Sequence, residues 1–174
     1  ADPSDEGDWC PGESSSSWHG THVAGTINAV QDNGIGVTGL APNVKVQHLR
    51  ALGACGGTGA DILAAVIWGS GGDLSDWGID VPGQDPGINP TPASVLNLSL
   101  GGADSCDPVS QQIFDEARAR GVTIVVAAGN ESENVSTSWP ANCQWVVAVA
   151  ASTRNGALSG YSNFGTSPGQ IALT

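Results

Sequence analysis

The stretch His19-Gly-Thr-His-Val-Ala-Gly-Thr26 packs two imidazoles, two glycines and two threonines into eight residues, and an apolar run follows it. Residues 23–30 carry small side chains on one face and predict a helix, with His19 at its N-terminus. A helical zinc hydrolase would need a glutamate directly after the first histidine, and Gly20 and Thr21 stand there instead. Metal binding is therefore the weaker interpretation of the pair, and a structural histidine is the plain alternative.

Length and composition indicate one compact, turn-rich α/β domain: 174 residues, 40% hydrophobic, with 25 glycines and 13% charged residues. The net charge is −12 and only five residues are Lys or Arg, which argues against nucleic acid as a partner. No apolar run approaches the roughly 20 residues that span a bilayer, so no membrane association is expected. The polar, acidic start at Ala1 does not read as a secretory signal, and we expect a processed or truncated beginning.

Strand and helix patterns alternate along the rest of the chain. Residues 44–51 predict a β-branched strand, and 60–68 predict a helix. A long loop at 69–92 is an insertion or functional, and we assign it no chemistry. Three buried strands are expected at 94–102, 122–128 and 145–151, the second apolar throughout, as in a parallel sheet covered on both faces. Between the first two, a helix begins at Asp107-Pro108, is buried through Ile113, Phe114 and Ala117, and ends at Gly121.

Three of these stretches resemble one family. The octapeptide at His19 resembles the signature around the catalytic histidine of subtilisin-like serine proteases, the subtilases of peptidase family S8. The strand at 94–102 is similar to the strand that lines their substrate pocket, and Ala127-Ala-Gly-Asn130 resembles their oxyanion segment. The resemblance implies a three-layer αβα fold with a mostly parallel sheet. It also implies a secreted, extracellular serine endopeptidase of the bacterial type, monomeric at full length and acting on polypeptides.

The resemblance also implies roles for single residues. His19 would be the general base, with His22 structural, and Asn130 would donate a hydrogen bond to the oxyanion. Without the resemblance, an asparagine after a strand is an ordinary turn residue, and a glycine-rich stretch is an ordinary loop. The residues expected to bind substrate are Gly56, Gly57 and Thr58 on one edge, Ser99, Leu100 and Gly101 on one pocket wall, and Ala127, Ala128 and Gly129 beside Asn130.

Residues 30–37 correspond to a loop that commonly holds a structural calcium in subtilases. Calcium takes carboxylate, amide and carbonyl oxygens. No catalytic metal is expected, and a plain tight turn at Asp32-Asn-Gly34 is the alternative. The segment is one residue longer than the common subtilisin version. The candidate ligands are Asp32 and Asn33 by side chain, and Val30, Ile35 and Val37 by carbonyl.

Four cysteines allow three disulfide pairings, and four reduced thiols are the alternative. We favour Cys10–Cys55 and Cys106–Cys143, the latter two lying in loops beside the same half of the sheet. Secreted bacterial subtilases carry disulfides of this sort. In the family, the aromatic-proline bond that matches Trp139-Pro140 is often cis.

The catalytic triad is incomplete. No strand ending in the triad aspartate precedes His19, and Asp2, Asp5 and Asp8 lie in a Pro/Gly-rich acidic stretch. Gly165-Thr-Ser167 imitates the nucleophile motif, but the Pro-Gly that follows stops a helix from starting there. We therefore expect residues 1–174 to be part of a catalytic domain without its Asp-bearing N-terminal and Ser-bearing C-terminal parts, poorly folded and inactive alone. The alternatives are a non-catalytic peptide-binding pseudoprotease and a metal hydrolase that uses His19 and His22.

Overall fold

The computed structural model describes residues 17–53, 55–81, 87–167 and 169–172, and the chain forms two compact units, residues 1–65 and 66–174. Each unit has its own internal hydrogen bonding. Cys10 and the acidic N-terminal stretch lie outside the described residues, so the predictions made for them stay predictions.

Helix α1 spans His19–Asn28 and opens the first unit. His19 is its first residue, as predicted. Trp18 takes the N-cap position in the left-handed region, with a φ of 53° and no side-chain cap, and its carbonyl accepts from the main-chain N–H of His22 at 2.9 Å. The chain returns across the other end of α1, where main-chain N–H groups of residues 39–41 donate to carbonyls of residues 26, 27 and 29. These bonds satisfy carbonyls that a helix C-terminus leaves without partners.

The predicted strand at 44–51 is wrong, since none of these residues is assigned to a strand. Alternating β-branched residues are a local signal, whereas a strand also needs a hydrogen-bonded neighbour. Helix α2 spans Gly59–Gly69, close to its predicted bounds. Thr58 caps its start: the Thr58 hydroxyl accepts from the Asp61 N–H at 3.1 Å and donates to the Asp61 carboxylate at 2.7 Å.

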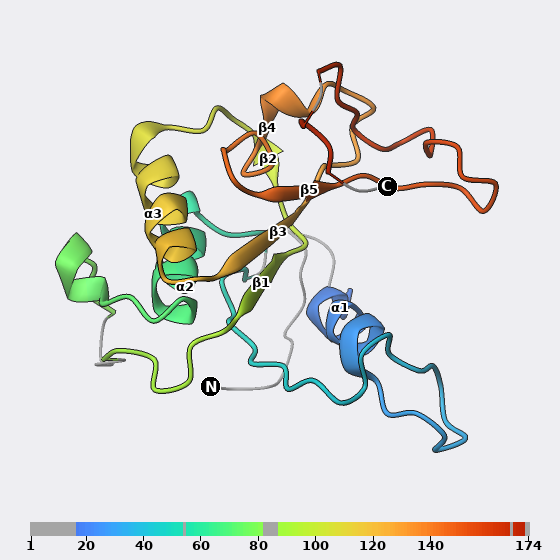
Figure 1. Ribbon diagram of the computed structural model, residues 1–174, viewed down its shortest axis with the longest axis horizontal. Coiled ribbons are helices and arrows are strands. Elements are labelled where there is room, and N and C mark those ends of the chain that lie inside the picture. The colour runs from blue at the N-terminus through green and yellow to red at the C-terminus, as the bar shows by residue number, and fades with distance from the viewer. Residues whose placement is uncertain (1–16, 54, 82–86, 168, 173–174) are drawn as a thin grey trace. The chain divides into compact units, whose positions relative to one another are not determined.

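The second unit is built on a three-stranded parallel sheet of β1 (Val95–Leu98), β3 (Thr123–Ala127) and β5 (Val147–Val149), in the order β1-β3-β5 (Figure 1). Helix α3 (Pro108–Ala119) forms the crossover from β1 to β3 and packs on β3. A small antiparallel sheet pairs β2 (Gly102–Ala103) with β4 (Ser138–Trp139). Two short 3₁₀ helices complete the unit, η1 at Leu74–Trp77 and η2 at Val135–Thr137.

The core of this unit lies between the sheet and α3. Ile124 and Val126 of β3 are buried against this side, as are Phe114 and Ala117 of α3. The alternate residues of β3 are only half-buried, and Val95 of β1 is 56% exposed. The other face of β3 thus carries Val125 and Ala127, which are half-buried, and the exposed Thr123. A continuous apolar strand shows that both faces suit burial, and it does not show what covers them.

Helix α3 begins and ends at the predicted residues. Its N-cap, Asp107, accepts from the main-chain N–H groups of Val109 and Ser110 at 2.8 and 3.1 Å, and also from the Ser110 hydroxyl. Pro108 occupies the first turn, where its missing N–H costs nothing. Gly121 follows the helix with a φ of +86°, the left-handed conformation that ends many helices.

Replacing Asp107 by alanine is expected to lower the free energy of unfolding by about 1 kcal/mol at pH 7, the usual contribution of an N-cap. The hydrogen bonds from Ser110 hold the pKa of Asp107 below its ordinary value. A lowered folded-state pKa means that the stabilisation is complete above the pKa of the unfolded chain and is lost as the pH falls through the folded value. Asp107 is exposed, so solvent screens its charge. The pH-dependent contribution of that charge is therefore only a fraction of the free energy that the cap contributes to folding.

Urea unfolding at pH 7 and again below about pH 3 would measure this effect, since an unperturbed aspartate titrates near 3.9. The difference in the free energy of unfolding between wild type and the Asp107→Ala variant should be smaller in acid than at pH 7. Asp80 is exposed and caps no helix, so Asp80→Ala is the matched control, with little expected change. Equal losses for the two variants would contradict the capping role.

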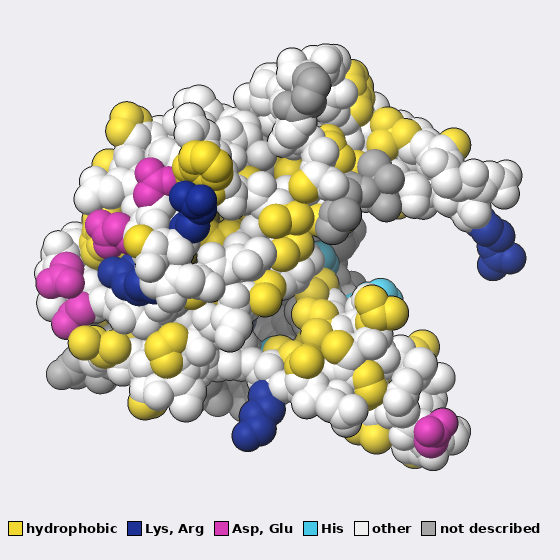
Figure 2. All heavy atoms as spheres, viewed as in Figure 1, with side chains coloured by type: hydrophobic (Ala, Val, Ile, Leu, Met, Phe, Trp, Pro, Cys, Tyr) yellow, Lys and Arg dark blue, Asp and Glu magenta, His cyan; other side chains and the backbone are white. Residues whose placement is uncertain are grey.

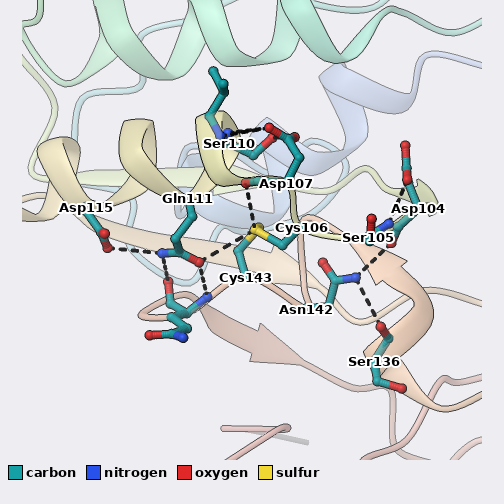
Figure 3. Close-up of a disulfide and its surroundings, with 12 residues drawn as sticks. Asp104, Ser105, Cys106, Asp107, Ser110, Gln111, Asp115, Ser136, Asn142 and Cys143 are labelled. Carbon is teal, nitrogen blue, oxygen red and sulfur yellow. Dashed lines mark hydrogen bonds between the residues drawn. A yellow bond between two sulfur atoms is a disulfide. The ribbon is translucent and has the colours of Figure 1, made fainter.

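Three contacts join α3 and the residues just before it to the chain before β5, and Figure 3 shows the first two, at Cys106 and Gln111. The predicted disulfide Cys106–Cys143 is confirmed, with its Cα atoms 5.2 Å apart. Gln111 of α3 accepts from the Gln144 N–H at 2.8 Å and donates to its carbonyl at 3.3 Å. The guanidinium of Arg118 lies 4.2 Å from the ring centre of Trp145, a cation–π distance. Cys55 is also disulfide-bonded, and Cys10, its predicted partner, lies outside the described residues.

The acidic composition shows on the surface of the second unit. On the face drawn in Figure 2, Asp and Glu side chains gather over α3 and η1. Asp76 of η1 and Asp115 of α3 are both exposed. Such a surface favours solubility. Among the described residues, no helix has the length and apolar character needed to cross a bilayer.

Candidate active site

The carboxyl ends of β1 and β3 bring two of the predicted substrate segments together. Leu98 pairs with Val126 at the end of the β1–β3 ladder, so Ser99–Gly101 leave the sheet at the same edge as Ala128–Gly129, which follow Ala127, the last residue of β3. The Ser99 hydroxyl accepts from the Asn97 side-chain amide at 2.9 Å. A Cβ on Gly101 would come within 3.1 Å of the Trp139 carbonyl, so the chain passes close to β4 here. In parallel α/β sheets, ligands bind at this edge.

Asn130 follows directly and is exposed, as a group that meets a substrate must be. Its main-chain N–H donates to a carboxylate oxygen of Glu131 at 2.8 Å. Gly129, just before it, has a φ of +110°, and a Cβ there would collide with the side chains of Glu131 and Asn163. Both the left-handed conformation of residue 129 and the lack of room for a Cβ beside Glu131 and Asn163 therefore require a glycine at this turn.

The base proposed by the sequence, His19, is the first residue of α1 and is exposed. Its main-chain N–H donates to the Ser17 hydroxyl at 3.1 Å. His22 is one turn further along the helix, and its carbonyl accepts from the Thr26 hydroxyl at 3.0 Å. In the described part of the chain, no group of three or more His, Cys, Asp or Glu residues could hold a metal ion.

The glycine-rich edge of the first unit is a tight turn. Gly53 and Gly56 exchange main-chain hydrogen bonds of 2.8 and 3.2 Å, and Cys55 and Gly56 have φ values of +70° and +101°. A Cβ on Gly57 would collide with the main chain of residue 51 and the side chain of Leu52. The Thr58 hydroxyl is already hydrogen-bonded to Asp61 at the start of α2. Only the main chain of Thr58 would therefore be available to bind a substrate.

The candidate calcium loop contains the expected kinds of donor. Asn33 turns its side-chain oxygen back onto the N–H of Ile35 at 2.9 Å, the predicted tight turn. Asp32, with a φ of +56°, makes no hydrogen bond or ion pair with the described residues. Val30, Ile35 and Val37 are exposed by 64–77%, so the loop is accessible. One carboxylate, one amide oxygen and nearby carbonyls form an oxygen donor set that fits calcium in kind.

The structure identifies two further residues that the sequence patterns did not single out. Asn163 is completely buried, and its side chain bonds to both ends of the loop that carries Asn130. Glu131 links Asn163 to the Asn130 main chain. Asn163 lies in the segment Tyr161-Ser-Asn-Phe-Gly165. Its partners lie about 30 positions earlier, beyond the reach of any local pattern. The Trp139–Pro140 bond is cis, as the resemblance implied.

In the second unit, loops with polar residues and glycines follow the carboxyl ends of parallel strands. This arrangement is typical of α/β enzymes and binding proteins whose ligand site lies at that edge of the sheet. The sequence pattern of the subtilase family matches residues 3–173. The chain therefore belongs to the subtilase family.

Known proteins agree with this assignment. The chain is 50% identical over 170 residues to an extracellular protease of Xanthomonas campestris pv. campestris, an alignment that covers 93% of this chain and 28% of that protein. A solved structure described as proteases from Pseudoalteromonas arctica PAMC 21717 matches with a TM-score of 0.78 and 47% identity, over 90% of this chain and 42% of that one. A cold-adapted subtilisin-like serine proteinase matches with a TM-score of 0.65 and 30% identity, over 89% and 47%. The fold is thus subtilisin-like, and the chain spans less than half the length of these proteins.

Proposed function

We propose that this chain is part of the catalytic domain of a secreted serine endopeptidase that cleaves polypeptides. The observation that carries the proposal is the subtilase match over residues 3–173, in a chain where His19 opens a helix and Asn130 follows a parallel strand. The name of the Xanthomonas relative, an extracellular protease, supports secretion. The triad aspartate and serine would come from sequence outside these 174 residues.

In this mechanism the imidazole of His19 takes the proton of the nucleophilic serine as its oxygen attacks the scissile carbonyl. The carbonyl oxygen becomes negatively charged, and the side-chain amide of Asn130 donates a hydrogen bond to it. His19 then gives the proton to the leaving amine, and the acyl-enzyme forms. Water then takes the place of the amine. His19 removes a proton from the water as its oxygen attacks the acyl carbonyl, and returns that proton to the serine oxygen as the acid product leaves. The edges at 56–58 and 99–101 would hold the extended substrate by main-chain hydrogen bonds.

The test is to treat the full-length protein with a fluorophosphonate probe, to identify the labelled residue by mass spectrometry, and to follow casein hydrolysis. We expect labelling of one serine outside residues 1–174 and loss of hydrolysis in step with labelling. A folded protein that binds peptides but neither labels nor hydrolyses would be a pseudoprotease. Hydrolysis that a chelator abolishes, with no serine labelled, would point to a metal hydrolase that uses His19 and His22.

The candidate calcium site is part of the same proposal. Asp32 and Asn33 would bind the ion by side chain, and Val30, Ile35 and Val37 by carbonyl. Calcium there would cross-link the loop after α1. A ligand that binds only the folded state at 100 times its Kd stabilises it by about 2.7 kcal/mol. At about 2–4 °C per kcal/mol, chelated full-length protein should gain several degrees in Tm when calcium is added.

Asp32→Ala should remove that gain in Tm, while Asp80→Ala should keep it. Magnesium should substitute poorly, because it demands a smaller and more regular octahedral shell. If Asp32→Ala and wild type gain equally from calcium, the ion does not bind at residues 30–37.

A further inference from the structure

Asn163 makes an unusual number of hydrogen bonds for one buried side chain. Its amide nitrogen lies 3.0 Å from the Ala128 carbonyl, 2.7 Å from a carboxylate oxygen of Glu131 and 2.8 Å from the Ser138 hydroxyl. Its amide oxygen accepts from the main-chain N–H groups of Glu131 and Glu133, both at 3.0 Å. Two N–H bonds thus serve three acceptors, and the side chain joins residues 128, 131, 133 and 138.

These contacts enclose Asn130 on both sides in the chain. The Asn163 main-chain N–H also donates to the Gly129 carbonyl at 3.1 Å, so residues 128, 129, 131 and 133 are all fixed to one residue. No hydrogen bond joins Asn163 to Asn130 itself among the described residues, and the side chain of Asn130 is exposed. A loop pinned at its flanking residues holds the residue between them in one main-chain conformation, which is what a preorganised donor requires.

The link to Asn130 itself runs through Glu131. One carboxylate oxygen, Oε2, accepts from both the Asn163 amide at 2.7 Å and the Asn130 main-chain N–H at 2.8 Å. The main-chain N–H of Asn130 therefore already donates to Glu131, and its side-chain amide is the group left to donate to an oxyanion. A carboxylate released from Asn163 could turn toward that amide and compete with the oxyanion as an acceptor.

We propose that Asn163 is a positioning residue for Asn130, acting through the Glu131 carboxylate and the main chain of residues 128–133. This inference rests on the proposed function, since it assigns a role within that reaction. Asn163 does not touch the substrate in this scheme. It fixes where the Asn130 amide lies when charge develops on the carbonyl oxygen.

The test is Asn163→Asp in the full-length enzyme. Aspartate keeps the shape and the acceptors for the Glu131 and Glu133 N–H groups but loses the donors and places a carboxyl group against Glu131. We expect kcat to fall by about 10–100-fold with KM changed by less than about 3-fold, since a misplacement of about 1 Å can cost 10²-fold. Fluorophosphonate titration counts the folded active sites, so kcat is expressed per competent enzyme.

A double-mutant cycle separates positioning from general destabilisation. In the Asn130→Ala background, the donor is absent, so Asn163→Asp should lower kcat by less than about 2-fold further. Ser138→Ala removes another hydrogen-bond partner of Asn163, one that lies outside residues 128–133, and it should leave kcat within about 2-fold of wild type. Additive losses in the cycle, or an equal loss in Ser138→Ala, would overturn the proposal.

If Asn163→Asp does not fold, Glu131→Ala replaces it in the cycle, because Glu131 is exposed and its side chain can be removed without opening the core. It breaks the same link and should show the same non-additivity with Asn130→Ala, and additivity would again overturn the proposal. A wild-type protein that fails to label or hydrolyse refutes the proposed function instead. An active wild type with an additive cycle refutes only the role of Asn163.

Discussion

The His19→Ala variant of the full-length protein is expected to lose about 10⁶-fold in kcat, a magnitude known from the triad histidine of subtilisin itself and not obtained from this structure. Without an imidazole, the serine hydroxyl keeps its proton at neutral pH and the leaving amine receives none. KM should change little, because His19 acts on the reacting atoms. The rate of fluorophosphonate labelling should fall with kcat, and single-turnover kinetics would show that the acylation step is the one that slows.

His22→Ala is the matched control for this prediction. His22 lies on the same helix one turn further on and is exposed as well, so the variant removes an identical side chain from the same element. We expect kcat within about 3-fold of wild type, because His22 takes no part in the proposed proton transfer and a surface substitution usually changes stability by no more than about 0.5 kcal/mol. If His22→Ala were as damaging as His19→Ala, the two histidines would act together, and a metal-binding pair would become the better interpretation.

Asn130→Ala is expected to lower kcat by about 10²–10³-fold, the figure measured for the corresponding oxyanion donor of subtilisin and adopted here for its family. The amide bonds to an oxygen that carries full charge only in the transition state, so the loss should fall on kcat and leave KM within a few-fold. Steady-state kinetics on a short peptide amide substrate, with active sites titrated, would measure both constants.

Ser132→Ala provides the control in the same loop. Ser132 is exposed and donates from its hydroxyl to the Gly160 carbonyl at 2.6 Å, so its removal breaks one hydrogen bond that involves neither Asn130 nor Asn163. We expect less than about a 3-fold change in kcat. A loss for Asn130→Ala that appears mainly in KM would show that Asn130 binds the ground state of the substrate and is not an oxyanion donor.

The sequence predicted those elements whose signals are local. Helix α3 carries its own boundaries in Asp107, Pro108 and Gly121, and the structure places the cap and the final turn at those residues. The strand expected at 44–51 was wrong because its pattern was equally local, whereas a strand depends on a neighbour elsewhere in the chain.

The candidate site shows the same division between local and distant signals. The motifs at His19 and Asn130 were found because each is a short contiguous run with a family resemblance. Asn163 was not found, because its significance lies in contacts with residues 128–138, more than 20 positions away. An asparagine in a loop has no periodicity, and only the structure shows that it is buried with its amide fully used.

The order of these pieces along the chain has a consequence during translation. Strands β1 and β3 and the loop with Asn130 leave the ribosome before residue 163, whose side chain fixes that loop. We therefore expect the loop at 128–133 to stay mobile on the nascent chain until Asn163 has emerged. Ribosome-bound chains from which residues up to 160 have emerged should be cut in this loop by a trace of added protease, and chains with the whole domain exposed should resist. Equal resistance would refute this order. On this view the loop that carries Asn130 takes its final conformation only after residue 163 has emerged.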